Sequence, residues 1–313
     1  MNRKTVYQMK NKIGVICLFF LAGVSFAQQD AQYSQYMFNS LVLNPAYAGS
    51  RESISIVALH RNQWVGIPGA PKTNTLSVHT PLKNQKLGIG FHILTDEIGP
   101  KSTAGVLGSF AYRIKLKSGK LAFGIRAGVY SYRFKWNEID YKDATDIYNS
   151  SSQAQKIVST YDFGMYYYTN SYYIGGAISH LDEDNYTASN GFSGATASLS
   201  RHFIGTVGKA FRFSDAVTFK PSMVIKTVKN APGSVDLNAS FLFSGNFWFG
   251  LGIRSNNGLV FNFEINPTRK LRLGYAYDYQ MNKLKTVSNG SHELFIGFDL
   301  DITKDKTLSP RYF

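Results

Sequence analysis

Residues 121–130 read Leu121-Ala122-Phe123-Gly124-Ile125-Arg126-Ala127-Gly128-Val129-Tyr130, and the alternation in this stretch decides the fold. Apolar side chains occupy every odd position, whereas the even positions hold small residues, one arginine and one tyrosine. Successive side chains of a β-strand point to opposite faces, so the stretch predicts a strand with one oily face and one small or charged face. Strands of this kind form the wall of a transmembrane barrel, where one face meets lipid and the other meets the lumen.

The same alternation returns in the C-terminal part of the chain, at 247–254, 259–266 and 271–280. One set of alternate positions there is rich in phenylalanine, leucine and tyrosine, and the other set carries glycine with isolated charges such as Arg254 and Asp278. A soluble β-sandwich also alternates, but its outward face is usually long and polar. We therefore predict an all-β fold, a transmembrane antiparallel β-barrel.

Alternation and turn residues together predict about 14 strands, an even number, as in bacterial single-chain barrels. The predicted strands cover 53–64, 74–80, 87–94, 103–114, 120–134, 160–169, 172–179, 201–211, 216–227, 234–243, 247–254, 259–266, 271–280 and 291–300. Connections after the even strands are short, and most of those after the odd strands are longer. Because periplasmic turns are short and surface loops are long, this parity predicts both termini on the periplasmic side and the segments 135–159 and 180–200 on the cell surface.

Aromatic residues gather near predicted strand ends, as with Tyr130, Tyr132 and Trp136 and in the run 166–168. Amphipathic rings favour the membrane interface, so we expect these residues to form aromatic girdles. No stretch after residue 27 approaches 18 consecutive apolar residues, which excludes a helical membrane protein.

Residues 1–27 have the three parts of a secretory signal peptide. Basic residues precede an apolar run from Ile13 to Val24, and small residues in Ser25-Phe26-Ala27 precede the expected cleavage site. We therefore predict export by this signal peptide, an N-terminal extension over 28–52 and an outer-membrane barrel over 53–313. The single cysteine lies in the leader, so we expect no disulfide in the mature protein.

Nothing in the sequence indicates catalysis. The six histidines, at positions 60, 79, 92, 180, 202 and 292, are scattered over different predicted strands and lack metal-binding spacing. The acidic run Asp182-Glu183-Asp184 is interpreted as a solvated loop turn in preference to a cation site. The net charge of +14 could suggest nucleic acid, but export and alternation favour outer-membrane lipid or an acidic partner. We therefore expect no enzyme activity, no catalytic, cofactor-binding or metal-binding residues, and no cofactor.

The region before the first strand does not alternate. It contains Gln32-Tyr33-Ser34-Gln35-Tyr36-Met37-Phe38-Asn39 and then Asn44-Pro45-Ala46-Tyr47-Ala48-Gly49. Asn-Pro favours a turn and Ala-Gly permits close backbone approach, so this region predicts an N-terminal periplasmic or plug-like segment tucked against or into the barrel.

The predicted partner or plug contacts combine this segment with the first hairpin. They are Asn44, Pro45, Tyr47, Gly49, His60, Arg61, Gln63, Trp64, Pro71 and Lys72. For His60, Arg61, Gln63 and Trp64 a purely structural hairpin that packs the barrel wall is an equally good interpretation.

In these segments the chain resembles the PorP/SprF-like outer-membrane proteins of the type IX secretion system and gliding machinery of the Bacteroidota. The resemblance rests on SQYM and NPAYAG, on HRNQW with GAPKT, on LGIGF with DEIGP, and on the terminal SPRYF. It implies an outer-membrane barrel that receives or anchors a secreted, adhesin-like surface protein with a C-terminal sorting domain. It also implies contacts with other type IX secretion or periplasmic components. The residues alone leave open a diffusion porin or small-solute channel, and a soluble secreted β-protein.

Overall fold

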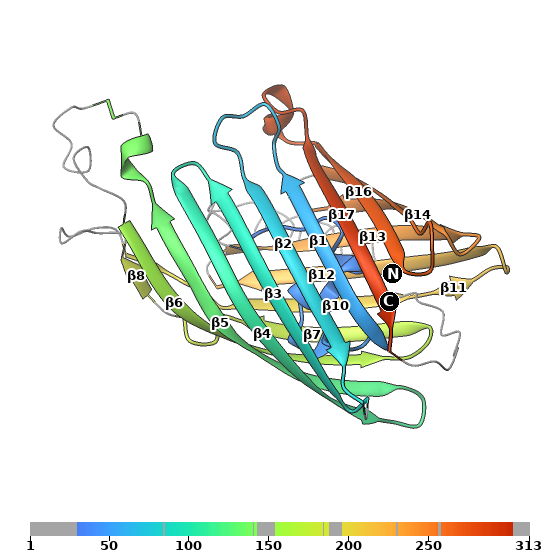
Figure 1. Cartoon of the computed structure of the whole chain (residues 1–313). Coiled ribbons are helices and arrows are strands. Elements are labelled where there is room, and N and C mark those ends of the chain that lie inside the picture. Colours follow the sequence, from blue (N-terminus) through green and yellow to red (C-terminus); the bar gives the residue numbers. More distant parts are fainter. Residues whose placement is uncertain are drawn as a thin grey trace, which may run out of the picture.

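The computed structural model describes residues 30–83, 85–139, 141–142, 154–183, 185–187, 196–229, 231–255 and 258–302. Within these residues the chain forms a closed antiparallel β-barrel of 14 strands, with 3-10 helices and no α-helix (Figure 1). None of the described helices is both long enough and apolar enough to cross a membrane. The predicted signal peptide and the terminal SPRYF segment lie outside the described residues.

Each wall strand pairs with the next along the chain, and pairing between β1 and β17 closes the ring. The wall strands are β1 (Ser53–Asn62), β2 (Lys72–Pro81), β3 (Leu87–Ile98), β4 (Lys101–Lys115), β5 (Lys120–Phe134), β6 (Ala154–Tyr168), β7 (Tyr172–Ser179), β10 (His202–Lys209), β12 (Val217–Val228), β13 (Ala231–Phe243), β14 (Phe247–Arg254), β15 (Gly258–Ile265), β16 (Leu271–Gln280) and β17 (Ser291–Asp301). The short β11 (Phe211–Arg212) extends the β10 edge along β12, and β8 (Asn185–Thr187) pairs separately with β9 (Thr196–Ser198). The predicted number of wall strands is therefore confirmed.

The two rims of the barrel differ in the length of their connections. One rim carries 63–71, 135–153, 180–201 and 281–290 together with three connections of two or three residues, and we call it the long-connection rim. The other, the short-turn rim, carries 82–86, 116–119, 169–171, 213–216, 244–246 and 266–270. Strand β1 begins and strand β17 ends at the short-turn rim, as the parity of the connections predicted.

The hairpin of β3 and β4 is longer than the sequence suggested. Its strands continue to Ile98 and from Lys101, and they meet in a turn where Gly99 adopts a φ of +51°. Asp96 stays in the ladder, paired with Thr103. The predicted loop over 95–102 is wrong because polar residues at a barrel rim extend beyond the lipid and need not leave the strand.

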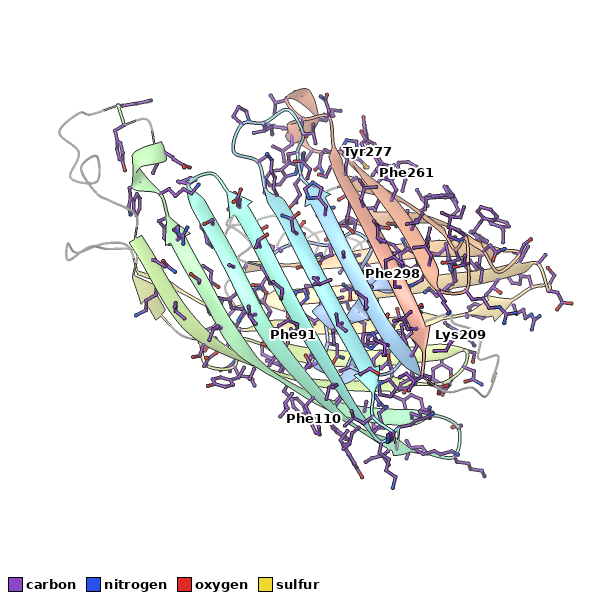
Figure 2. The ribbon with its side chains drawn as sticks, in the orientation of Figure 1. Phe91, Phe110, Lys209, Phe261, Tyr277 and Phe298 are labelled. Carbon is purple, nitrogen blue, oxygen red and sulfur yellow. The ribbon has the colours of Figure 1, made fainter. Side chains whose placement is uncertain are left out.

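The apolar alternate positions of the wall strands face outward all round the barrel. On β14, Phe249 and Ile253 are exposed while Trp248 and Arg254 are buried, and neighbouring strands alternate in the same way. Exposed phenylalanines lie on the outer face of β3, β4, β15 and β17, as Phe91, Phe110, Phe261 and Phe298 show (Figure 2). An outward apolar surface of this kind is what a lipid-facing wall requires and disfavours the soluble alternative.

Several aromatic residues that were expected in the girdles face the lumen instead. Tyr132 and Tyr166 are buried, and Tyr130 packs 6.0 Å from Tyr132, centroid to centroid, on the same face. Residues two apart in a strand share a face, so Tyr130 and Tyr132 face the same side as Arg126. Tyr166 lies opposite Ala122 of β5, which is also on that side. The girdle prediction is therefore wrong for them, whereas Tyr167 lies on the opposite face.

The core of the molecule lies inside the barrel, where the N-terminal segment, residues 30–52, runs through the lumen (Figure 1, blue). It carries η1 (Tyr36–Phe38), η2 (Ser40–Val42) and η3 (Pro45–Tyr47). Two further 3-10 helices, η4 (Trp136–Glu138) and η5 (Lys283–Thr286), belong to connections at the long-connection rim. Because the N-terminal segment passes through the lumen before β1, Asp30 lies beside the start of β10 at the long-connection rim. Both termini were expected on the side of the short turns.

Candidate functional site

The NPAYAG turn is fixed to the wall by the side chain of its first residue. Asn44 Oδ1 accepts a hydrogen bond from the Ala46 amide at 2.9 Å, which caps η3. Its Nδ2 donates to the carbonyl oxygens of Met165 at 2.9 Å and Gly176 at 3.3 Å, on β6 and β7. One side chain thus shapes the turn and ties it to two strands, which only an amide with both a donor and an acceptor can do.

Glycines on the inner face make room for this turn. A Cβ atom on Gly124 of β5 would lie 2.2 Å from the Ala46 nitrogen, and one on Gly88 of β3 would lie 2.2 Å from the Ala48 oxygen. Both distances are far below van der Waals contact, so the backbone of the turn touches the backbone of the wall. The close fit of the plug therefore explains why the inward-facing positions of the wall strands are rich in glycine.

Where the segment leaves the lumen, two wall side chains hold its backbone. Arg113 of β4 donates from Nη1 to the Ala48 carbonyl at 2.6 Å. The Gly49 amide donates to Nδ1 of His79 on β2 at 3.0 Å. The Tyr47 ring packs edge-on against His79 and Tyr166, with centroids 5.3 and 5.5 Å away.

A buried ionic cluster holds the other end of the segment, and we call it the Arg61 cluster. Its members are Ser34, Arg61, Arg254, Asp278 and Glu293. Arg61 of β1 pairs with Asp278 of β16 at 2.6 Å and with Glu293 of β17 at 3.2 Å. The side chains of these three residues are at most 2% exposed.

The carboxylates of the Arg61 cluster bind the N-terminal segment directly. Glu293 accepts the backbone amides of Ser34 at 2.9 Å and Gln35 at 2.8 Å. The Ser34 hydroxyl donates to Asp278 and in turn accepts from Arg61 at 2.8 Å. Hydrogen bonds in which one partner is charged are stronger than neutral ones, so the cluster attaches the plug firmly.

Between these two attachments, η1 packs into an aromatic pocket of the wall. The Phe38 ring lies 5.6 Å from Phe295 and 6.3 Å from Trp248, measured between centroids. The ammonium of the buried Lys220 lies 4.9 Å from the Trp248 ring and 5.8 Å from the Phe38 ring. Cation–π contacts are strongest where water is excluded, as here.

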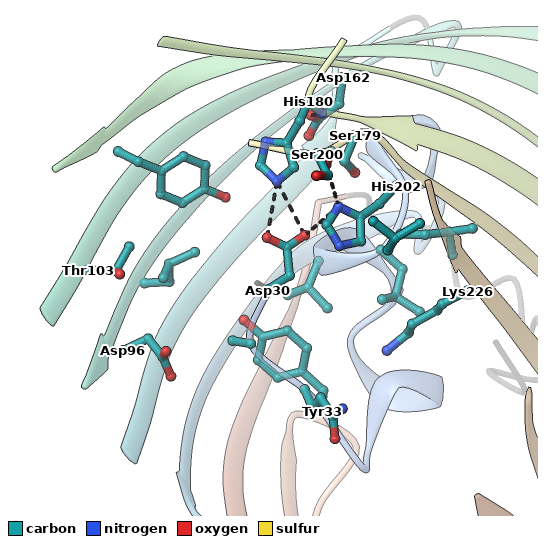
Figure 3. A pocket seen from close by; sticks show the side chains of 18 of the residues that line it. Asp30, Tyr33, Asp96, Thr103, Asp162, Ser179, His180, Ser200, His202 and Lys226 are labelled. Carbon is teal, nitrogen blue, oxygen red and sulfur yellow. Dashed lines mark hydrogen bonds and ion pairs between the residues drawn. The ribbon is translucent and has the colours of Figure 1, made fainter. Parts of the chain in front are cut away.

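The segment leaves a cavity of about 720 Å³ unfilled at the long-connection end of the lumen (Figure 3). Its lining includes Tyr33 from the segment and Asp96, Thr103, Tyr130 and Lys226 from the wall. The volume lies within the roughly 300–1,000 Å³ range of ligand-binding cavities. The cavity therefore has room for a small ligand or a short chain segment, with both charges and aromatic rings to contact it.

One wall of this cavity carries Asp30, His180 and His202, which we call the Asp30 cluster (Figure 3). Asp30 Oδ1 lies 3.1 Å from His180 Nε2, and Oδ2 lies 3.6 Å from His202 Nδ1. Burial alone would raise the pKa of the Asp30 carboxyl, but the two imidazoles hold that pKa below its usual range. Burial would lower the pKa of His180, yet the Asp30 carboxylate raises it above its usual value.

The structure separates the predicted contact residues into groups. Asn44, Pro45, Tyr47 and Gly49 are buried in the plug, and Arg61 belongs to the cluster that holds it.

The hairpin residues lie elsewhere. His60 is exposed on the outer face and lies 2.7 Å from Asn74 Oδ1, and Lys72 is also exposed. The Gln63 amide donates to the Pro71 carbonyl at 2.9 Å, and the Trp64 amide donates to Ser291 Oγ at 3.1 Å, which shapes the β1–β2 connection.

Some residues of the site had no sequence signal. Asp278 and Arg254 were visible as isolated charges among the glycine-rich alternate positions of their predicted strands. The Asp30 cluster was not visible, because its members come from the N-terminal segment, the 180–201 connection and β10. Only closure of the barrel around the segment brings these three side chains together.

A family model described as type IX secretion system membrane protein PorP/SprF matches residues 25–298. A comparison with curated proteins finds no match. Among solved structures, the CymD monoaromatic hydrocarbon channel is similar at 13% identity, covering 86% of this chain and 92% of that one, with a TM-score of 0.49. Omp33 of Acinetobacter baumannii is 8% identical over 80% of this chain and 100% of that one, with a TM-score of 0.45. A Pseudomonas aeruginosa FadL homologue is 12% identical over 89% and 96%, with a TM-score of 0.43.

Proposed function

Because the chain belongs to the PorP/SprF family of type IX secretion system membrane proteins, we propose that its barrel receives or anchors a secreted surface protein. The protein is an outer-membrane β-barrel, and its family implies association with other components of the secretion system. The family is not a known enzyme family. The finer proposal is an adhesin-like partner with a C-terminal sorting domain, held at the cell surface and serving the secretion or gliding machinery.

The observation that carries this proposal is the filled lumen. The N-terminal segment is bonded to β6 and β7 by Asn44 and to β16 and β17 at Ser34. A barrel obstructed in this way is a poor diffusion pore, because a pore needs a continuous water-filled path. A plugged barrel with an unfilled cavity at the rim of long connections is better suited to hold a partner than to pass solutes.

The size of the cavity limits how a partner can bind. At about 720 Å³ it accepts a ligand-sized group and not a folded domain. We therefore propose that the partner inserts a short segment between Tyr130 and Lys226 while its folded part rests on the long connections. A side chain that fills the cavity should weaken a partner that inserts a segment there, but it should not affect a partner that binds only to the long connections.

The direct experiment is gentle purification of the protein from its native outer membrane, with identification of the proteins that co-elute. We expect a large secreted protein with a C-terminal sorting domain. Deletion of the barrel is expected to remove this partner from the cell surface. If the barrel elutes alone and the surface display of secreted proteins is unchanged by the deletion, the proposal is wrong.

A matched pair of variants tests the role of the cavity. Thr103 on β4 lines the cavity, and Ala104 beside it points outward. Thr103→Trp is expected to fill part of the cavity and reduce partner retention, whereas Ala104→Trp places the same ring near the lipid interface, where it is tolerated. Surface amounts of the partner and heat-modifiable gel migration of the barrel are measured together. Equal retention in two folded variants would exclude insertion into the cavity.

A further inference from the structure

We propose that Asp30, His180 and His202 form a binding site for a divalent transition-metal cation, with Zn²⁺ as the best-suited ion. The three side chains meet on the cavity wall, and one potential ligand atom from each lies within 4.8 Å of the others. This proposal does not depend on the proposed function of the barrel.

The spacing of the ligand atoms suits such an ion. Ligands at about 2.0–2.1 Å from Zn²⁺ in a tetrahedral arrangement lie about 3.3–3.4 Å from one another. His180 Nε2 and Asp30 Oδ1 are already 3.1 Å apart. The remaining ligand atoms must approach by at most about 1.5 Å, which side-chain rotation supplies.

Hydrogen bonds outside the cluster orient both imidazoles beside Asp30. A metal-bound histidine uses its other ring nitrogen for a second hydrogen bond, which fixes the tautomer. His180 Nδ1 lies 2.9 Å from the hydroxyl of the buried Thr160 on β6, which leaves Nε2 directed at Asp30. His202 Nδ1 donates to the Ser200 carbonyl at 2.9 Å and also lies 3.6 Å from Asp30 Oδ2, so an ion bound through Nδ1 would replace this hydrogen bond.

The backbone at His180 also indicates a constrained position. Its φ of +56° is in the left-handed region, which residues other than glycine seldom occupy. The His180 amide donates to Asp162 Oδ1 at 3.0 Å, and that contact helps to hold this conformation. Strained backbone that surrounding bonds enforce is common where a side chain must be held in one direction.

The donor set selects the class of ion. Imidazole nitrogens suit Zn²⁺ and its neighbours in the first transition series, whereas Ca²⁺ and Mg²⁺ prefer oxygen ligands. Three protein ligands next to a cavity leave a coordination position for water or for an incoming group. A bound ion would also fasten the N-terminal segment to the base of the 180–201 connection, since Asp30 belongs to the first and His180 to the second.

Metal titration of the full-length barrel, purified in detergent without a polyhistidine tag, tests the proposal. We expect one Zn²⁺ per chain by calorimetry and elemental analysis. Thr160→Val should weaken Zn²⁺ binding by about 10- to 100-fold, the usual cost of losing an outer hydrogen-bond partner. His202→Ala and Asp30→Ala should weaken binding by more than that, because each removes a ligand.

His92→Ala is the matched control. His92 lines the same cavity and is buried, but it bonds to Ser77 on β2 and lies outside the cluster. The substitution His92→Ala should leave the affinity of the protein for Zn²⁺ unchanged. If the wild-type chain binds no Zn²⁺, or if His92→Ala and His202→Ala bind it equally, the proposal is overturned. Heat-modifiable gel migration identifies misfolded variants. If His202→Ala does not fold, Thr160→Val replaces it in the comparison, and Zn²⁺ affinity equal to that of His92→Ala would overturn the proposal.

Discussion

The Arg61 guanidinium joins β1, β16, β17 and the N-terminal segment at one buried point. It bonds to Asp278, Glu293 and the Ser34 hydroxyl, and all these groups are shielded from water. A buried charge network of this kind adds little net stability compared with an apolar core, but loss of one member leaves the others uncompensated. The cluster therefore specifies where the segment sits more than it stabilises the barrel.

Replacement of Arg61 by alanine should destabilise the protein by about 3–5 kcal/mol, the usual cost of breaking a buried ion pair from one side. Lys120→Ala is the control, because Lys120 pairs with Glu52 at 2.7 Å at a site where both side chains are partly exposed. Its expected cost is below about 1 kcal/mol. Urea unfolding in lipid vesicles, followed by tryptophan fluorescence, measures both. Similar losses for the two variants would contradict a buried, specifying role for Arg61.

At the scale of elements, alternation was sufficient to predict the wall but not the plug. Strand β5 extends over Lys120–Phe134 as predicted, because each residue of a lipid-facing strand has only two environments. The N-terminal segment has no such periodicity. Its 3-10 turns depend on contacts such as those of Asn44 with β6 and β7, which are distant in sequence. The sequence indicated a turn at Asn44-Pro45 but could not identify the strands that receive it.

The fit between η3 and the wall can be tested by adding one carbon atom. Gly124→Ala places a Cβ against the Ala46 amide, and overpacking of this kind costs about 1–3 kcal/mol. Gly205→Ala on β10 is the control, because a Cβ there meets nothing within 4 Å. Hydrogen exchange of the peptide covering 40–49 should accelerate in Gly124→Ala and stay unchanged in Gly205→Ala. Equal exchange in both variants would show that the segment is not packed tightly on β5.

For the whole molecule, the decisive quantity is the path through the barrel. An eight-stranded barrel is filled by its own side chains, and barrels of 16 or more strands leave an aqueous channel. A barrel of 14 strands lies between these cases, so what occupies its lumen decides whether it conducts. Here the occupant is the protein's own N-terminal segment, whose backbone is held from β4 at one end to β17 at the other.

Single-channel recording in planar bilayers should therefore show a closed barrel for the wild-type chain. In the double variant Arg61→Ala with Gly124→Val, one attachment of the segment is weakened and the valine side chain occupies the space that η3 needs. This variant should open frequently, whereas the wild-type barrel should stay closed. Ala104→Trp with Gly205→Ala carries two wall substitutions away from the segment and should remain closed. A stable open state in the wild type, unchanged in the double variant, would instead favour a diffusion porin. In that case the plug would coexist with a conducting path, and partner anchoring would lose its main structural support.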